Sequence, residues 1–480
     1  MKRIYIVLAS VVITLSACNK DLSSLNDNIK SPGEGLVPAS SLFTDGLKNL
    51  VDNITTCNVN SNIFRLLSQY WTETTYTDES NYDLATRNIS DNWWRNQYRF
   101  VLVNLEEAKK YIPAQVTDAD VKKNQLAILD IVEVYTFSTL ISTYGNVPYS
   151  KALDINNLFP AYDDAKTIHA DLLKRLDADI ANLNTASAGF GSTADILLGD
   201  NIAGWKLFAN GLKLRLGILV ADSDPATAKV AIESAAKAVL ASNADNVVFK
   251  YLATTPNNNP VWGDQPNSKR ADFIATNTFT DLLTSLNDPR LPFFFDTATT
   301  AGLGYQGGEV GAGGSYAKNA HPASATVYAV DAPSTLLSYS ETEFILAEAA
   351  ERGYNVGGTA ESHYNNAVTA SILEWGGTAA DAATYLTDPN VAYASASGDY
   401  KQKIGTQKWI ALYNRGFDAW VENRRLDQPA LPTPVGALFE YPVRYAYPVT
   451  EQNLNAPNWK TAGAAIGGDK VTTKLFWDKF

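Results

Sequence analysis

The sequence contains few of the residues that most often carry chemistry in proteins. In 480 residues there are two cysteines and three histidines, the latter at positions 169, 321 and 363. No histidine has a second ligand at metal-binding spacing, and no paired-cysteine motif, H-E-x-x-H motif or EF-hand loop occurs. The sequence therefore predicts no metal and no cofactor, although the carboxylates of Asp264, Asp288 and Asp296 leave a divalent ion open.

Basic residues are also scarce. Lys and Arg number 39 against 51 Asp and Glu, which gives a formal net charge of −12, and the basic residues form no cluster. A surface that binds nucleic acid needs a concentrated positive face. This composition excludes nucleic acid as a partner.

Catalytic motifs are missing as well. Gly-x-Ser-x-Gly does not occur, and residues 302–307 match the dinucleotide motif G-x-G-x-x-G without the strand and helix that this motif requires around it. Two carboxylates would suffice for a glycosidase, but 51 candidates without a spacing constraint identify none. We predict no catalytic residue and no enzyme activity.

The N-terminus is typical of an exported lipoprotein. Two basic residues precede an apolar run, residues 4–15, that is too short to span a bilayer but suits a signal peptide. The run ends in Leu-Ser-Ala-Cys18, which resembles a bacterial lipobox, where the cysteine sulfur receives diacylglycerol. The alternative is an ordinary secretory signal with an incidental cysteine. We predict a signal peptide over residues 1–17, lipidation of Cys18 and a polar tether over residues 18–38.

The rest of the chain has globular composition, with 45% hydrophobic and 19% charged residues. After the N-terminal run, which is itself too short, no second hydrophobic stretch is long enough to span a membrane. With Cys18 lipidated, Cys57 is the only remaining thiol, which excludes an intrachain disulfide. Stability must then come from a large core, which we expect in a single domain over residues 39–480.

Helical patterns cover most of this domain. Residues 126–143 are apolar nearly all round and predict a buried central helix that ends at Tyr144-Gly145. The sequence Ser340 to Glu343 matches a capping box. Apolar spacing and terminal Pro or Gly residues predict further helices over residues 165–183, 205–220, 225–241, 340–353 and 359–375.

The last two of these helices are joined by a short loop and must lie antiparallel. Small residues at the offsets of tetratricopeptide second helices indicate divergent helix-pair repeats. The pattern breaks between residues 243 and 333, where Asn-Pro and Gly-rich stretches predict a loop-rich insertion. The predicted fold is mainly α, a tetratricopeptide-like helix-pair scaffold with a loop-rich variable region and few short strands.

Several stretches together resemble one family. They are YGNVPYS at residues 144–150, LLSYSETEFILAEAAERG at 336–353, KWIALY and GFDAW within 408–420 with Arg424-Arg425 after them, and the tail from Tyr447-Pro448 to Trp477-Asp478. The chain is similar to SusD/RagB-type nutrient-binding outer-membrane lipoproteins over essentially all residues from 18 to 480. It fits the divergent second branch of that family better than the starch-binding type.

The resemblance implies both a fold and a role. The fold would be four tetratricopeptide-like helix pairs supporting a variable, loop-rich half. The protein would be lipid-anchored in the outer membrane, face the cell exterior, and act as lid for a SusC-like TonB-dependent barrel. It would capture oligosaccharide or peptide without cleaving it. Two other classes remain open: a surface glycoside hydrolase on a helical scaffold, and a structural tetratricopeptide-like adaptor.

The recognisable motifs are scaffold, so ligand-binding residues are predicted from loop composition alone. Sugars present flat C–H faces and many hydroxyls, which favour aromatic side chains beside Asn, Asp or Arg. Trp93 and Trp94 precede a helical pattern and are expected in the core. The predicted ligand-binding residues are Tyr76, Asn81, Tyr82, Arg87, Trp262, Tyr305 and Tyr316.

Overall fold

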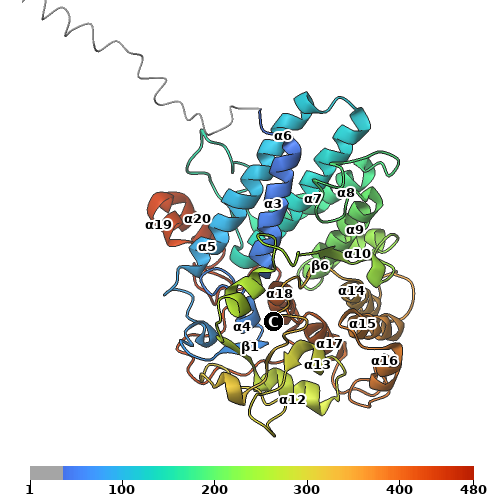
Figure 1. Ribbon diagram of the computed structural model, residues 1–480. Coiled ribbons are helices and arrows are strands. Elements are labelled where there is room, and N and C mark those ends of the chain that lie inside the picture. The colour runs from blue at the N-terminus through green and yellow to red at the C-terminus, as the bar shows by residue number, and fades with distance from the viewer. Residues whose placement is uncertain (1–35) are drawn as a thin grey trace, which may run out of the picture. The chain divides into compact units, whose positions relative to one another are not determined.

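The structure is a computed structural model that describes residues 36–480. The predicted signal peptide, the predicted lipidation site Cys18 and most of the predicted tether lie outside the described residues. The chain divides into two units, Met1–Pro38 and Ala39–Phe480. All the helices and strands described belong to the second unit (Figure 1).

The first half of this unit consists of long helices. One continuous helical stretch is formed by α5, the π-helical segment η2 and α6. Side chains of Asp118, Asp164, Asn201 and Asp224 accept hydrogen bonds from first-turn amides of α7 to α10, which fixes where these helices begin. The bounds are α3 (Ala39–Thr55), α4 (Phe64–Leu67), α5 (Ile89–Arg95), η2 (Asn96–Leu102), α6 (Val103–Gln115), α7 (Ala119–Tyr144), α8 (Ala165–Asn182), α9 (Ile202–Leu219) and α10 (Pro225–Ala235).

Helix α7 is the predicted central helix. Within residues 36–480 it alone is long and apolar enough to cross a membrane. The sequence had predicted no such stretch after the N-terminal run. However, 83% of the apolar window of α7 is buried inside the protein, so it is a core helix. It ends at Tyr144 because Gly145 takes a φ of 86°, as predicted.

The C-terminal third is again helical. Its elements are α14 (Tyr339–Glu351), α15 (Ala360–Glu374), α16 (Ala379–Tyr385), α17 (Tyr400–Ala411), α18 (Gly416–Leu426), α19 (Val449–Leu454) and α20 (Ala456–Ala465). The predicted capping box at Ser340 is wrong, because Ser338 caps α14 and the Ser340 hydroxyl donates to the carbonyl of Ala367. The predicted end of α10 at residue 241 is also wrong: the helix ends at Ala235, and Leu240 is buried beyond it.

Helices that follow each other in the chain pack as pairs. Within the described residues these are α7 with α8, α9 with α10, α14 with α15, and α17 with α18, while α3 packs on α6. Figure 1 shows α7 to α10 in the upper right of the view and α14 to α17 below them. The prediction of a mainly α-helical scaffold of tetratricopeptide-like pairs is confirmed.

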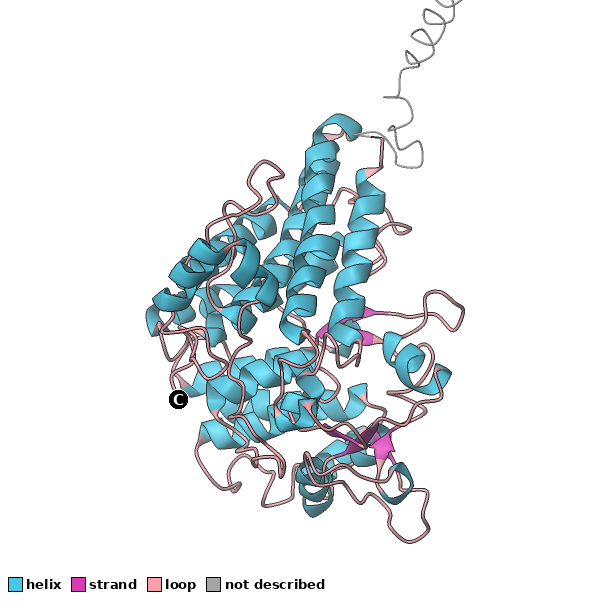
Figure 2. Cartoon of the chain, turned by 90° about the vertical axis from the view of Figure 1, so that its left-hand side faces the viewer, coloured by secondary structure: helices cyan, strands magenta, loops and turns pink. Residues whose placement is uncertain are grey.

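Residues 243–333 are rich in loops but contain short elements. Strands are short and pair across long stretches of chain, β1 with β3, β2 with β6 and β4 with β5, all antiparallel (Figure 2). Strand bounds are β1 (Trp71–Glu73), β2 (Val247–Phe249), β3 (Phe273–Ala275), β4 (Phe295–Asp296), β5 (His321–Pro322) and β6 (Ser334–Leu337). The helical segments of this region are η3 (Asn243–Asp245), α11 (Pro260–Trp262), η4 (Gly263–Asn267), α12 (Asn277–Ser285), α13 (Leu291–Phe294) and η5 (Tyr316–Lys318). One further short segment, η1 (Glu79–Asn81), follows β1.

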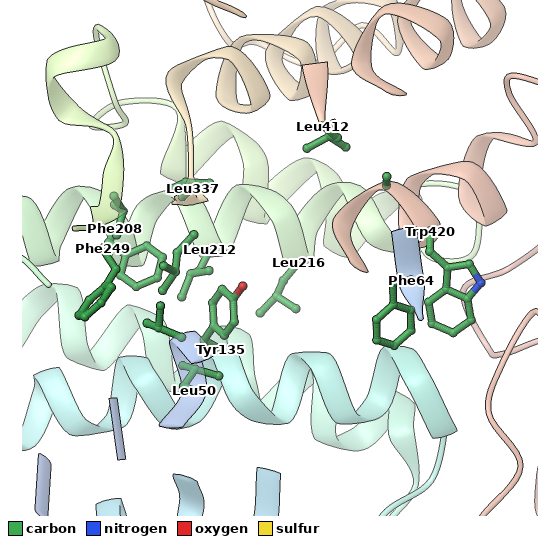
Figure 3. Packing of buried hydrophobic residues seen from close by; sticks show 14 of the residues in the cluster. Leu50, Phe64, Tyr135, Phe208, Leu212, Leu216, Phe249, Leu337, Leu412 and Trp420 are labelled. Carbon is green, nitrogen blue, oxygen red and sulfur yellow. The ribbon is translucent and has the colours of Figure 1, made fainter. Parts of the chain in front are cut away.

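One large hydrophobic core joins these parts. Leu50 of α3, Tyr135 of α7, Leu212 of α9 and Leu337 of β6 belong to it, as do Phe64 and Trp420 (Figure 3). Trp93 and Trp94 are buried, as predicted. Because the loop-rich segments contribute Phe249 and other buried residues, they are packed onto the scaffold rather than appended to it.

Candidate ligand-binding site

Two of the predicted binding residues line one cavity of about 170 Å³, here named the Tyr76 cavity. Tyr76 and Arg87 contribute to its wall. The remaining lining residues come from three segments of the chain and are Cys57, Asn58, Val59, Asn60, Glu73, Thr75, Asp264, Gln265, Arg270, Asp272 and Phe273. Polar and charged side chains therefore surround a small hollow at which one exposed aromatic ring, that of Tyr76, is placed.

Strand pairing brings two of these segments together. In the β1–β3 ladder Glu73 lies opposite Phe273, and beyond it the Thr74 amide donates to the carbonyl of Asp272 at 2.7 Å. The third segment is tied on by Thr56, whose hydroxyl donates to Asp264 Oδ2 at 2.8 Å. Residues far apart in the sequence thus form one wall because the three-residue strand β1 pairs with β3.

Tyr76 is the exposed aromatic of this site. Its side chain is 79% exposed, and it makes no ring contact or hydrogen bond with another described residue. Its φ of 54° lies in the left-handed region, which is unfavourable for a residue with a Cβ. A large ring held in water on a strained backbone contributes little to folding, so it is available to stack on a ligand.

An acid pair lies beside the cavity. The Glu73 carboxyl accepts from the Ser80 amide at 2.9 Å and from the Ser80 hydroxyl at 3.0 Å, and it shares a hydrogen bond with Glu79. Burial, followed by the charge of Glu79, raises the pKa of Glu73 to about 9. Burial also raises the pKa of Glu79, although the paired Arg87 guanidinium opposes this. At neutral pH the pair therefore holds a proton, and Glu73 presents an uncharged carboxyl to the cavity.

The facing wall carries further charges. Arg270 pairs with Asp272 at 2.6 Å, and Asp272 also accepts from the Gln265 amide at 3.0 Å. Burial raises the pKa of Asp264. These groups offer both donors and acceptors to a ligand with several hydroxyls, and the Arg270 and Asp272 charges neutralise each other.

The other residues predicted nearby have different surroundings. Asn81 ties two segments together, because its Nδ2 donates to the carbonyls of Thr77 and Gly311 at 2.9 Å each. Tyr82 is only 4% exposed, and its hydroxyl accepts from Gln69 at 2.9 Å. It lines a separate cavity with residues 427–441. Trp262 is half-buried and directly precedes η4, which supplies Asp264 and Gln265 to the Tyr76 cavity.

Tyr305 and Tyr316 lie in the Gly-rich stretch and do not line the Tyr76 cavity. Both are half-buried, and burial followed by the charge of Asp296 raises their pKa values, that of Tyr316 to about 12. The Tyr316 ring centroid lies 4.1 Å from that of His321. Residues 302–307 form turns with no helix directly after them, as the sequence predicted.

Composition alone did not select Asn58, Asn60, Arg270 and Asp272. The β1–β3 pairing brings Arg270 and Asp272 near Tyr76, and the hydrogen bond from Thr56 to Asp264 ties on the segment that holds Asn58 and Asn60. The three carboxylates at which the sequence left a divalent ion open are separate: Asp264 accepts from Thr56, Asp288 pairs with Arg290, and Asp296 accepts from Ser324. Among residues 36–480, no three His, Cys, Asp or Glu side chains are grouped for a metal ion.

Comparison with known proteins assigns the chain to a family. The family model described as "SusD-like_2: Starch-binding associating with outer membrane" matches residues 33–448. The chain belongs to the SusD-like family. This confirms the resemblance found in the sequence, and the match lies in the second SusD-like branch. No curated protein matches the chain.

Solved structures with this fold cover nearly the whole chain. A chitin-binding protein is 25% identical, with a TM-score of 0.79 over 92% of this chain and 100% of that chain. A SusD homologue from Bacteroides uniformis is 26% identical, with a TM-score of 0.78 over 92% and 99% of the two chains. A chitin-binding SusD homologue from Flavobacterium johnsoniae is 23% identical, with a TM-score of 0.79 over 91% and 98%, and shows the shared fold.

Proposed function

We propose that this SusD-like protein captures oligosaccharides at the cell surface and delivers them to a TonB-dependent outer-membrane barrel, on which it acts as a lid. Residues 1–17 serve as signal peptide, Cys18 carries the lipid anchor in the outer membrane, and residues 18–38 form the tether to a domain over residues 39–480. The domain faces the cell exterior and binds its ligand without cleaving it.

The Tyr76 cavity is the observation that carries this proposal. It combines one exposed ring with amides, carboxyls and paired charges, which is what the apolar faces and hydroxyls of a sugar require. The family description refers to starch binding in association with an outer membrane, and two similar structures are named as chitin-binding. A peptide is the competing ligand, and the experiment below separates the two.

The acid pair argues against a glycoside hydrolase. Retaining glycosidases hold their two carboxyl groups about 5–5.5 Å apart and inverting enzymes hold them farther apart, so that the glycosidic bond fits between them. Glu73 and Glu79 are hydrogen-bonded to each other, and the Glu79 side chain is fully buried. The exposed ring at a concave site likewise favours small-ligand capture over a purely structural adaptor.

Titration calorimetry of residues 19–480 against oligosaccharides derived from starch and from chitin, and against mixed peptides, tests the proposal. We expect saturable binding of an oligosaccharide with no reaction product in the same samples. Tyr76→Ala should weaken this binding at least about tenfold, equivalent to about 1.4 kcal/mol, whereas Tyr76→Phe should retain most of it because the ring remains.

A matched control is Phe159→Ala, which removes an aromatic side chain that is also exposed but does not line the cavity. It should leave the affinity unchanged. Cleavage of the ligand would contradict the capture proposal and show that the protein is a hydrolase. Binding of peptides alone would show that the ligand is a peptide rather than an oligosaccharide. Oligosaccharide binding that is insensitive to Tyr76→Ala would move the site elsewhere on the protein.

A further inference from the structure

A second cavity, of about 360 Å³, lies where the loop-rich region meets the helical scaffold, here named the junction cavity. Its walls come from the end of α3, from α7, from the C-terminal ends of α15 and α17, from the turn into α18 and from residues 325–335. Its volume is within the range of about 300–1,000 Å³ that is usual for small-molecule sites.

The cations of this cavity are already occupied. Arg65 donates to the carbonyls of Thr55 and Thr56 at 2.8 and 3.0 Å and to Asn414 Oδ1 at 2.8 Å. Arg415 is paired with Glu341 and with Asp418. Because Arg415 is paired with two carboxylates and three N–H groups of Arg65 already donate to fixed neutral oxygens, a ligand that carries a phosphate or a carboxylate gains little from these two cations.

Other hydrogen-bonding groups of the cavity, in contrast, remain open. The Nδ2 amide of Asn414 and the indole N–H of Trp375 have no hydrogen-bond partner among the described residues. Glu374 accepts only a long hydrogen bond from the Thr335 hydroxyl at 3.3 Å through one oxygen, so its other oxygen is unpaired within residues 36–480. These donors and acceptors line one space together with the half-buried rings of Trp375 and Phe417.

The backbone holds these groups in place. Asn414 has a φ of 68°, so its amide is set by a left-handed turn between α17 and α18. Trp375 is the C-cap residue of α15, and its ring packs on Phe294 with centroids 4.7 Å apart. The opposing loop is tied down by Asn259, whose amide donates to the carbonyl of Ala332 at 2.7 Å. Rigid walls of this kind reduce the entropy lost on binding.

We propose that the junction cavity is a second binding site, specific for a single uncharged sugar residue, separate from the Tyr76 cavity. The sugar hydroxyls are hydrogen-bonded by Asn414, Trp375 and Glu374, and its apolar face packs on the aromatic wall. The inference goes beyond the proposed capture of an oligosaccharide at the Tyr76 cavity. Each of the two proposed sites can be confirmed or contradicted without the other.

Titration calorimetry of residues 19–480, which keep the compact unit Ala39–Phe480 whole, tests this site. The probes are glucose, galactose, mannose and N-acetylglucosamine, each as the free monosaccharide. We expect at least one to saturate with a dissociation constant of about 1 mM, because a ligand of this size gains little binding free energy in total. If none of the four saturates, the proposal is overturned.

Three variants locate the binding. Ala329→Leu fills part of the cavity and should abolish monosaccharide binding. Trp375→Phe keeps the ring and removes the indole N–H, and Glu374→Gln keeps the side-chain volume, so these two test the site if Ala329→Leu fails to fold. Each should weaken binding about three- to tenfold, the loss of a typical hydrogen bond.

Tyr76→Ala is the matched control from the other cavity, and it should leave the monosaccharide affinity unchanged. Loss of monosaccharide binding in Tyr76→Ala, with full binding in the three junction variants, would assign the monosaccharide to the Tyr76 cavity and overturn the second site. Conversely, oligosaccharide binding that ignores Tyr76→Ala would contradict only the proposed capture site.

Discussion

Two buried carboxyl groups, Glu348 of the scaffold and Glu73 beside the Tyr76 cavity, have opposite surroundings. In the scaffold, Glu348 of α14 accepts from Arg425 of α18 at 2.7 and 2.5 Å, and both side chains are almost fully buried. Burial alone would raise the pKa of Glu348, but the charge and hydrogen bonds of Arg425 lower it. Beside the cavity, Glu73 faces another carboxyl, and its pKa is raised to about 9.

The difference concerns what each carboxyl group contributes to the protein. A buried ion pair with complete hydrogen bonding restricts how two helices can pack, because any other arrangement leaves a charge unpaired. Arg215 and Arg415 form ion pairs with Glu341 in the same manner, and their charges lower its pKa. The cavity wall instead keeps a proton-sharing pair and an exposed ring on strained backbone, features that cost stability and provide binding groups.

The largest expected effect is loss of the scaffold ion pair. Arg425→Met removes one partner from each of two carboxylates, since Arg425 also donates to Glu422 at 2.6 Å, and leaves Arg352 beside Glu348 and Lys408 beside Glu422. We expect the free energy of unfolding to fall by about 3–5 kcal/mol, measured by urea denaturation. The control is Lys110→Met, which breaks the exposed pair with Glu107 and should cost at most about 1 kcal/mol. Equal losses in the two variants would remove the distinction between buried and surface pairs.

A second variant tests whether the loop-rich region contains a scaffold-like element of its own. Arg290 and Asp288 are both fully buried and pair at 2.6 Å, and Arg290 also reaches Ser371 of α15 and Gln407 of α17. Arg290→Met should cost about 3 kcal/mol, at the lower end for buried pairs, because Asp288 still accepts from the backbone amide of residue 290.

The double variant Asp288→Asn/Arg290→Met serves as its control. It removes the orphaned charge and should recover part of the lost stability in the same urea titration. A double variant that is less stable than Arg290→Met would show that the contacts to α15 and α17, rather than the charge on Asp288, set the cost.

The sequence predicted the scaffold better than the site, for a physical reason. Helix periodicity and the glycine at 145 are local signals, so α8 and α15 lie close to their predicted bounds and α7 ends where predicted, although α7 begins at Ala119 rather than at the predicted residue 126. Where tertiary contacts decide, the local signal failed: β6 ends at Leu337 in its pairing with β2, which places the cap of α14 at Ser338.

The candidate site depends on contacts that no local pattern encodes. Tyr76 and Arg87 were found because aromatic and polar residues crowd their own segment. Arg270 and Asp272 join them only through the pairing of two three-residue strands, which have too little periodicity to be recognised. Composition could not separate the exposed Tyr76 from the buried Tyr82, because both are tyrosines among polar turn residues.

The acid pair Glu73–Glu79 predicts that the stability of the folded protein depends on pH. Because the pKa of Glu73 is raised from 4.5 to about 9, the folded protein holds a proton that the unfolded chain releases. Stability from this group is fully present below about pH 4.5 and is lost as the pH rises to about 9.

Glu73→Gln imitates the protonated side chain and should remove this dependence. Relative to the wild-type chain, we expect the variant to gain roughly 1–3 kcal/mol in unfolding free energy between pH 5 and pH 8, measured by urea denaturation at each pH. Glu107→Gln, on the exposed helix surface, provides the control and should show no such trend. A constant difference between Glu73→Gln and wild type over this range would contradict the shared proton.

The smallest expected effect concerns the strain at Tyr76 and separates binding from folding most cleanly. Tyr76→Ala keeps a Cβ at a φ of 54°, whereas Tyr76→Gly removes it. We expect Tyr76→Gly to be more stable than Tyr76→Ala by up to about 1 kcal/mol in thermal unfolding, since relief of left-handed strain exceeds the entropy that glycine adds to the unfolded chain. Both variants should lose oligosaccharide binding equally. If the tyrosine stabilised the loop, both variants would instead be less stable than the wild-type chain by more than this margin, and the ring would belong with the scaffold rather than with the binding site.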